Sequence, residues 1–119
     1  MTRFSMVTFE QVRKIALSLS NVEESTSYGT PAFKTAGKLL ARLKEDGDSL
    51  VVGTTFEERE DLLAADPATY YITDHYLKYP WVLVRLSRVS PDAMRDLLGR
   101  ALRLTQSTNR RAPKRRPIR

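Results

Sequence analysis

The segment KLLARLKEDGDSLVVGT, residues 38–54, decides the fold because it reads as two strands joined by a tight turn. Asp46-Gly47 is a strong hairpin signal, since such turns need positive φ angles, which glycine adopts without strain. In the strand predicted over 38–45, alternate residues separate into an apolar face and a mostly basic face. The apolar face holds Leu39, Ala41 and Leu43, and the other holds Lys38, Arg42 and Lys44 together with Leu40. This alternation is typical of an antiparallel sheet with one face toward water.

Further short strands are predicted on either side of this hairpin. Upstream, residues 28–35 form a strand-like run that reaches the hairpin through Ala36-Gly37, and the polar segment 21–27 before it reads as a loop. Downstream, residues 70–73 and 81–86 are rich in aromatic and β-branched residues, with a loop over 75–80 between them. We therefore expect about five strands, most of them paired as hairpins.

Three helices are predicted from capping signals and apolar spacing. Thr8 and Gln11 form a capping box before a helix that ends near residue 20, and Thr55 begins a short helix through residue 65. Ser90-Pro91 starts the last helix, whose apolar stripe runs from Met94 to Leu102. The order α-β-β-β-α-β-β-α predicts a compact α+β domain, with an antiparallel sheet flanked by the first and last helices.

All of the net positive charge lies in the last fourteen residues, QSTNRRAPKRRPIR. This segment holds six of the 20 Lys and Arg residues and none of the 14 acids, so residues 1–105 are formally neutral. We divide the chain into a domain over 1–105 and a basic tail over 106–119, which is too polar to bury a core and is expected to be disordered. Its charges would contact DNA or another polyanion, or would only make the chain more soluble.

The composition excludes several classes of protein and of site. The chain has no cysteine, which excludes disulfides, thiolate metal sites and a cysteine nucleophile. No apolar run approaches the ~20 residues that span a bilayer, and the N-terminal residues lack the apolar region of a signal peptide. We expect a cytoplasmic protein that has no membrane partner and no cofactor.

Two segments carry a family likeness, namely YGTPAFK at 28–34 and HYLKYPWVLVR at 75–85. Together with Gly37-Lys38, the Asp46-Gly47 hairpin and the capped helices, they make residues 7–105 resemble the MmcQ/YjbR-like family. The resemblance implies a compact α+β fold with a curved antiparallel sheet, described as a double wing and commonly labelled DNA-binding. It supplies no catalytic residues, and the basic tail lies outside it.

The basic residues offer a nucleic-acid site. Lys34, Lys38 and Arg42, with Lys44, would form a basic wing if they converge on one convex face, and such a ribbon can follow phosphates. The alternative is an ordinary solvated strand face. The candidate nucleic-acid residues are therefore Lys34, Lys38, Arg42, Lys44, Arg110, Arg111, Lys114, Arg115 and Arg116.

Aromatic residues offer a second candidate site, which is a ligand pocket. It would be built from Tyr28, Thr30, His75, Tyr76, Tyr79 and Trp81. Such rings can stack on a ligand, although they also serve as ordinary packing. His75 is the only histidine and has a suitable intrinsic pKa for acid–base work, but no nucleophile or metal motif accompanies it.

The sequence thus predicts a small DNA-binding protein of low sequence specificity, not an enzyme, that uses the basic wing and the tail. The alternative is a non-enzymatic domain that binds a small ligand or a protein partner through the Tyr28/Thr30 and 75–81 segments. The two differ in geometry, because the first needs a convex positive face and the second needs a concave aromatic pocket.

Overall fold

The structure is a computed structural model that describes residues 7–114, with side chains described as far as Gln106. Within these residues lie three α-helices, one 3₁₀ helix and a six-stranded antiparallel sheet. The helices are α1 (Phe9–Ser18), α2 (Phe56–Ala65), η1 (Asp74–Tyr76) and α3 (Pro91–Lys114). The strands are β1 (Glu23–Ser27), β2 (Thr30–Thr35), β3 (Lys38–Leu43), β4 (Ser49–Gly53), β5 (Tyr70–Tyr71) and β6 (Trp81–Arg85). The α+β class and the flanking terminal helices are as predicted.

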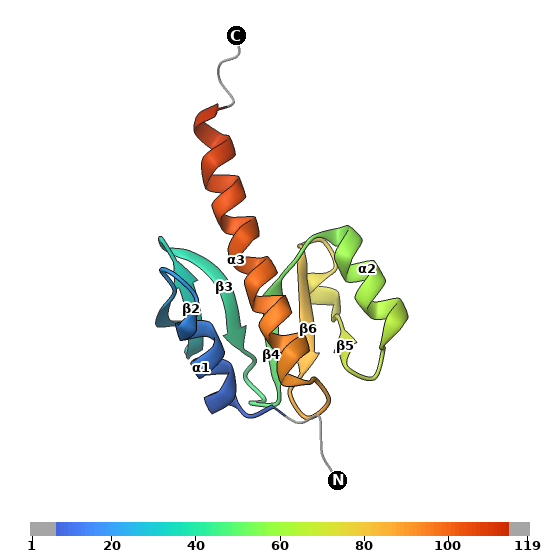
Figure 1. Cartoon of the computed structure of the whole chain (residues 1–119). Coiled ribbons are helices and arrows are strands. Elements are labelled where there is room, and N and C mark those ends of the chain that lie inside the picture. Colours follow the sequence, from blue (N-terminus) through green and yellow to red (C-terminus); the bar gives the residue numbers. More distant parts are fainter. Residues whose placement is uncertain (1–6, 115–119) are drawn as a thin grey trace.

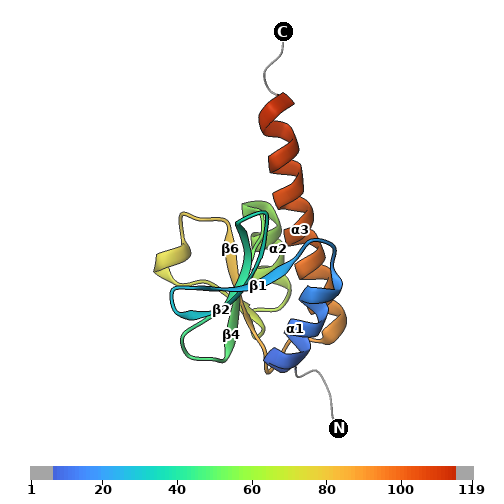
Figure 2. The same ribbon diagram turned by 90° about the vertical axis from the view of Figure 1, so that its left-hand side faces the viewer.

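The sheet has the strand order β1-β2-β3-β4-β6-β5, and its two faces are covered differently (Figure 1). The main core joins one face of the sheet to α1 and α3, through fully buried residues such as Phe33, Leu50 and Met94. Viewed from the side, α1 and α3 lie on one side of the sheet, and the segment containing η1 lies on the other (Figure 2). A small second cluster of Val51, Tyr76 and Leu83 packs under that segment. This second face is therefore only partly covered.

The predicted helix starts are confirmed. The capping box is complete at α1, where the Thr8 side chain accepts from the Gln11 backbone N–H and the Gln11 side chain accepts from the Thr8 backbone N–H. At α2, the Thr55 side chain accepts from the N–H of Glu58 at 3.0 Å. The Ser90 hydroxyl accepts from the N–H of Ala93 at 3.1 Å, at the start of α3. Each bond satisfies a donor that the first helical turn leaves free.

The sheet has one strand more than the sequence predicted. Residues 23–27, interpreted above as part of a loop, form the edge strand β1, which pairs antiparallel with β2. The prediction failed because β1 has no buried residue and its sequence EESTS shows no apolar alternation. A contact from α1 helps to hold β1 in place, because the Arg13 guanidinium donates to the Glu24 carboxylate at 2.8 Å. This hydrogen bond raises the pKa of Arg13.

The predicted alternation in β3 is wrong because a bulge interrupts it. The register with β2 shifts, since Lys34 pairs with Leu39 although the residue before Lys34 pairs with Ala41. Leu40 is thereby left without a partner on β2, as in a β-bulge. Leu40 and Ala41 both pack into the main core, while Leu39 and Arg42 line one hollow on the opposite face. The bulge therefore puts Leu39 beside Arg42.

The last helix is longer than predicted. Its backbone stays helical as far as Lys114, and it extends well beyond the sheet (Figure 1). Disorder was predicted from residue 106 because the basic tail is too polar to bury a core, but residues 106–112 contain neither glycine nor proline to stop a helix. Residues 115–119, with Arg115 and Arg116, lie outside the described part of the chain.

Candidate functional site

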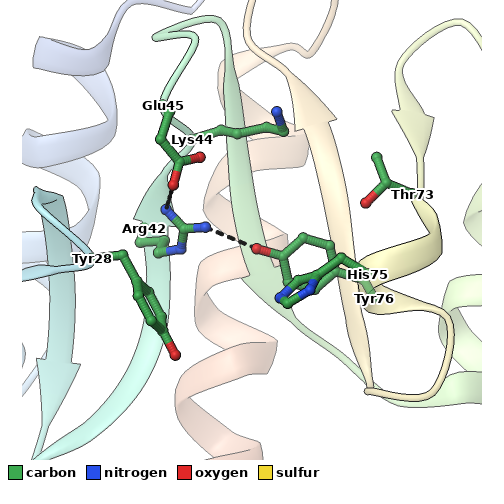
Figure 3. Close-up of a pocket in the computed structure, with 7 residues that line it drawn as sticks. All are labelled: Tyr28, Arg42, Lys44, Glu45, Thr73, His75 and Tyr76. Atoms are coloured by element: carbon green, nitrogen blue, oxygen red, sulfur yellow. Dashed lines mark hydrogen bonds and ion pairs between the residues drawn. The ribbon is translucent and has the colours of Figure 1, made fainter.

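The second face of the sheet carries two adjoining hollows. The first, of about 410 Å³, is lined by Tyr28, Arg42, Lys44, Glu45, Thr73, His75 and Tyr76 (Figure 3). The second, of about 360 Å³, shares four of these residues and adds Leu39, Val51, Tyr79 and Trp81. We call the two together the site hollow. Strands β3 and β4 provide its floor, and the β1–β2 turn and the 72–80 segment stand at its sides.

Arg42 on β3 lies between the two sides of the site hollow (Figure 3). Its Nη2 donates to the Tyr76 hydroxyl at 2.9 Å, whereas its Nη1 makes only long contacts. These reach Thr30 Oγ1 at 3.3 Å, the Leu43 carbonyl at 3.3 Å and the Glu45 carboxylate at 3.4 Å. Only 7% of Arg42 is exposed. The sheet thus buries a permanent cation that has one short hydrogen bond.

Tyr28 forms one wall of the site hollow from the β1–β2 turn. Tyr28 and Gly29 have φ angles of 54° and 80°, so this two-residue connection has the dihedral signs of a type I′ turn. Positive φ is unusual for a bulky aromatic residue and costs on the order of 1 kcal/mol. Tyr28 is nevertheless 82% exposed, and its ring centroid lies 5.1 Å from the Arg42 guanidinium carbon. The strained turn therefore holds an aromatic ring over the buried cation.

The opposite wall is held by a residue that the sequence analysis did not single out. Arg59 on α2 is only 3% exposed, and its Nη1 donates to the carbonyls of Tyr76, Tyr79 and Trp81 at 2.8–3.1 Å. Its Nη2 donates to the Leu77 carbonyl at 3.1 Å. One guanidinium therefore fixes the backbone of the segment that carries Tyr76 and Tyr79. No sequence pattern marked this role, because Arg59 lies in a helix with charged neighbours.

His75 lines the site hollow and is exposed. Its ring packs edge-on against Tyr76, with ring centroids 4.7 Å apart. Among the hydrogen bonds between described residues, none involves the His75 ring. Nor does the described part of the chain contain a group of three or more acidic or histidine residues placed to hold a metal ion.

All six residues predicted for a ligand pocket gather around this hollow. Five of them line it directly, and Thr30 contacts it through its hydrogen bond to Arg42. The apolar floor of Leu39 and Val51 was not predicted, because the bulge that turns Leu39 to this face leaves no signal in the sequence. Glu45 was not predicted as the partner of Arg42 either.

The predicted basic wing does not form one convex face. Arg42 is buried in the site hollow, while Lys38 lines a different hollow on the α3 side of the domain. Lys34 is half-buried between its cross-strand partners Glu23 and Leu39, and Lys44 lies 3.7 Å from the Asp46 carboxylate. The expected convergence of Lys34, Lys38 and Arg42 on one convex face is therefore wrong, because Arg42 is buried in one hollow and Lys38 lines another.

Comparisons with known proteins place the fold in a family. The crystal structure of Deinococcus radiodurans protein DR2400, with the domain DUF419, superposes with a TM-score of 0.75 at 22% sequence identity. That similarity covers 91% of this chain and 85% of the other, and it shows a shared fold. The search of curated proteins found no match. None of the helices described here is long and apolar enough to cross a bilayer.

The model of one family, YjbR, matches residues 17–104. The matched range includes β1 to β6 and most of the described part of α3, and therefore the whole site hollow. It also includes the YGTPAFK and HYLKYPWVLVR segments on which the resemblance was based. Because this match covers well over half of the sequence, the chain belongs to the YjbR family.

Proposed function

We propose that this chain is a non-enzymatic binding domain whose site hollow holds the anionic group of a small molecule against Arg42. The observation that supports it is the poor compensation of this buried charge. Within the described residues, the one carboxylate near Arg42 is that of Glu45, which lies 3.4 Å away and whose side chain is 62% exposed. Burying a cation is costly unless an anion or a full set of acceptors accompanies it. A ligand carboxylate or phosphate would supply the compensating negative charge that Glu45 supplies only weakly.

Glu45 competes with the ligand in this proposal. Its pKa is lowered, first by a hydrogen bond from its own backbone and then by the charge of Arg42. Glu45 is therefore ionised at neutral pH and remains available to Arg42 in the absence of a ligand. Because the Glu45 side chain is largely exposed and lies 3.4 Å from Arg42, an incoming anion that binds in two-pronged geometry can displace it.

The aromatic walls indicate that the anion belongs to a larger molecule. Tyr28 and Tyr79 are large apolar side chains that are 82% and 54% exposed, and both line the site hollow. Concave sites lined by aromatic rings with a few polar groups are typical of small-molecule binding. A free inorganic ion would make no use of these rings.

The experiment measures binding of benzoate, a small aromatic carboxylate, by isothermal titration calorimetry. Arg42→Gln is expected to weaken binding by roughly 10-fold or more, because a charge-assisted hydrogen bond contributes about 1.5–3 kcal/mol. Glu45→Gln is expected to strengthen binding several-fold, because it removes the competing carboxylate. Arg88→Gln is the matched control, since Arg88 is an exposed arginine that lines no part of the site hollow.

The gain expected for Glu45→Gln guards against a folding artefact, since an unfolded variant cannot bind more tightly. Equal losses in the Arg42 and Arg88 variants would instead mean that benzoate responds only to overall charge, and the proposal would fail. Circular dichroism of each variant confirms that its secondary structure is intact.

Duplex DNA is a second candidate ligand, and α3 is the feature that favours it. The helix extends beyond the domain into the basic tail, which carries six positive charges and no acid (Figure 1). Of these six residues, Arg110, Arg111 and Lys114 lie on the described helical backbone, and a cluster of basic residues can contact phosphates without sequence readout. The salt dependence of duplex binding tests this candidate. The cytoplasmic location stays a prediction.

A further inference from the structure

A third hollow, of about 320 Å³, adjoins the site hollow where β3 separates from β4. We call it the helix groove, because α3 forms one side of it. It is lined by Lys38, Leu39, Gly53, Thr54, Pro80, Trp81, Ala101, Leu104 and Thr105. Leu39 and Trp81 also line the site hollow, so the two depressions meet at these side chains. We call the series of residues from Arg42 past Leu39 and Trp81 to α3 the path.

Two features of the backbone open this path. Pairing between β3 and β4 involves only Ala41, Arg42 and Leu43 on β3, so the first half of β3 is free of β4. The bulge turns Leu39 toward the opening, as described above. At Gly53, an added Cβ would lie 3.3 Å from the Trp81 ring, so the absence of a side chain lets the indole lie close to β4. The path therefore follows from the register of the strands.

Polarity changes along this path from charged to apolar. At one end are Arg42, Lys44 and His75, together with the Glu45 carboxylate that an incoming anion would displace from Arg42. In the middle lie Val51, Leu39 and Trp81, and the far end is bounded by Ala101 and Leu104 of α3. The cation at the far end is Lys38, which is half-buried and whose aliphatic stem can cover an apolar chain.

We propose that the ligand of this domain is an elongated amphiphile, a carboxylic acid with an unbranched alkyl chain. This inference rests on the proposed function, since it places the acid group at Arg42. The chain runs over Leu39 and Trp81 into the helix groove. A compact anion would leave the apolar part of the path empty, and a ligand with several phosphates would meet apolar surface where it needs cations.

Trp81 is the only tryptophan in the sequence, and it lies where the two hollows meet, so its fluorescence reports on the middle of the path. The full chain is titrated with acetate, hexanoate and decanoate, all below the concentration at which decanoate forms micelles. Each methylene that is fully buried strengthens binding by about fourfold. Because the groove is open on one side, we expect decanoate to bind on the order of 100-fold more tightly than acetate, with hexanoate between them.

Variants locate the two ends of the ligand. Leu104→Gln in the helix groove is expected to weaken decanoate binding about tenfold and to leave benzoate binding unchanged. Leu17→Gln is the matched control, because Leu17 is an exposed leucine on α1 that lines neither hollow. Arg42→Gln is expected to weaken both ligands. Decyltrimethylammonium, which has the same chain and a cationic head, is expected to bind at least tenfold more weakly than decanoate.

Each contrary result identifies which step of the proposal is wrong. If benzoate binds through Arg42 but decanoate gains nothing over hexanoate, the amphiphile inference is overturned and the proposed function stands. If neither benzoate nor decanoate binds, the proposed function itself fails. If the cationic amphiphile binds as tightly as decanoate, the groove accepts any apolar chain, and the assignment of the acid group to Arg42 is wrong.

Discussion

Arg59 is a buried cation whose hydrogen bonds all end on backbone carbonyls of residues 76–81. Arg59→Met keeps most of the side-chain volume and removes four donated bonds. We expect the free energy of unfolding to fall by about 2–4 kcal/mol, because several of these carbonyls would lose their partner inside the protein. Urea denaturation measures the change. Arg100→Met is the control, since Arg100 makes exposed ion pairs and its loss is expected to cost less than about 1 kcal/mol.

Single residues were the hardest to interpret from the sequence. The pocket residues Tyr28, His75 and Trp81 could be predicted, because aromatic side chains and a lone histidine are conspicuous. The role of Arg42 could not, since its position in a basic strand indicated a solvent-facing cation. Its burial depends on Tyr76, 34 residues away in the sequence, which no local pattern reveals. The function of a charged residue depends on what covers it, and that is a tertiary property.

The turns between strands store backbone strain that can be removed. Ala36, which precedes Gly37 in the turn between β2 and β3, has a φ of 51° and an exposed side chain. Asparagine tolerates this conformation better than alanine, and Asn-Gly is a favoured pair for such turns. Ala36→Asn is therefore expected to raise the free energy of unfolding by about 0.5–1 kcal/mol, measured by thermal or urea denaturation. Ala68→Asn is the control, because Ala68 is also exposed but does not have positive φ. An equal gain in both variants would contradict the strain argument.

Secondary-structure elements were predicted correctly where a local sequence signal determines where they begin or end. Capped helix starts and glycine turns were located correctly, since each depends on a few neighbouring residues. The strand β1 and the bulge in β3 were missed because both arise from pairing. A polar edge strand exists only because β2 lies beside it, and the bulge is a mismatch between two strands. The bulge also matters most for the site, because it brings Leu39 beside Arg42.

In the molecule as a whole, the hollows and the net positive charge lie in different parts of the chain. The formally neutral residues 1–105 include the folded domain and its hollows, and the last fourteen residues contain all of the net charge. A ligand that recognises shape would therefore bind the domain, and a polyanion would bind the basic tail. The two candidate functions can be tested independently, because the groups they use do not overlap.

Duplex DNA binding is expected to depend on the tail and on salt. Fluorescence anisotropy of a labelled duplex is measured from 50 to 200 mM salt with the full chain. If most of the six tail charges contact phosphates, log K falls against log salt with a slope of about −5, so affinity drops about 1,000-fold over this range. Replacing Arg110, Arg111, Lys114, Arg115 and Arg116 with glutamine should remove most of this slope. Lys34→Gln with Lys38→Gln should leave the slope nearly unchanged, since both lysines lie in the folded domain. A change approaching about 2, the value expected for two lost phosphate contacts, would mean that the folded domain itself contacts DNA, and the separation of roles between domain and tail would be wrong.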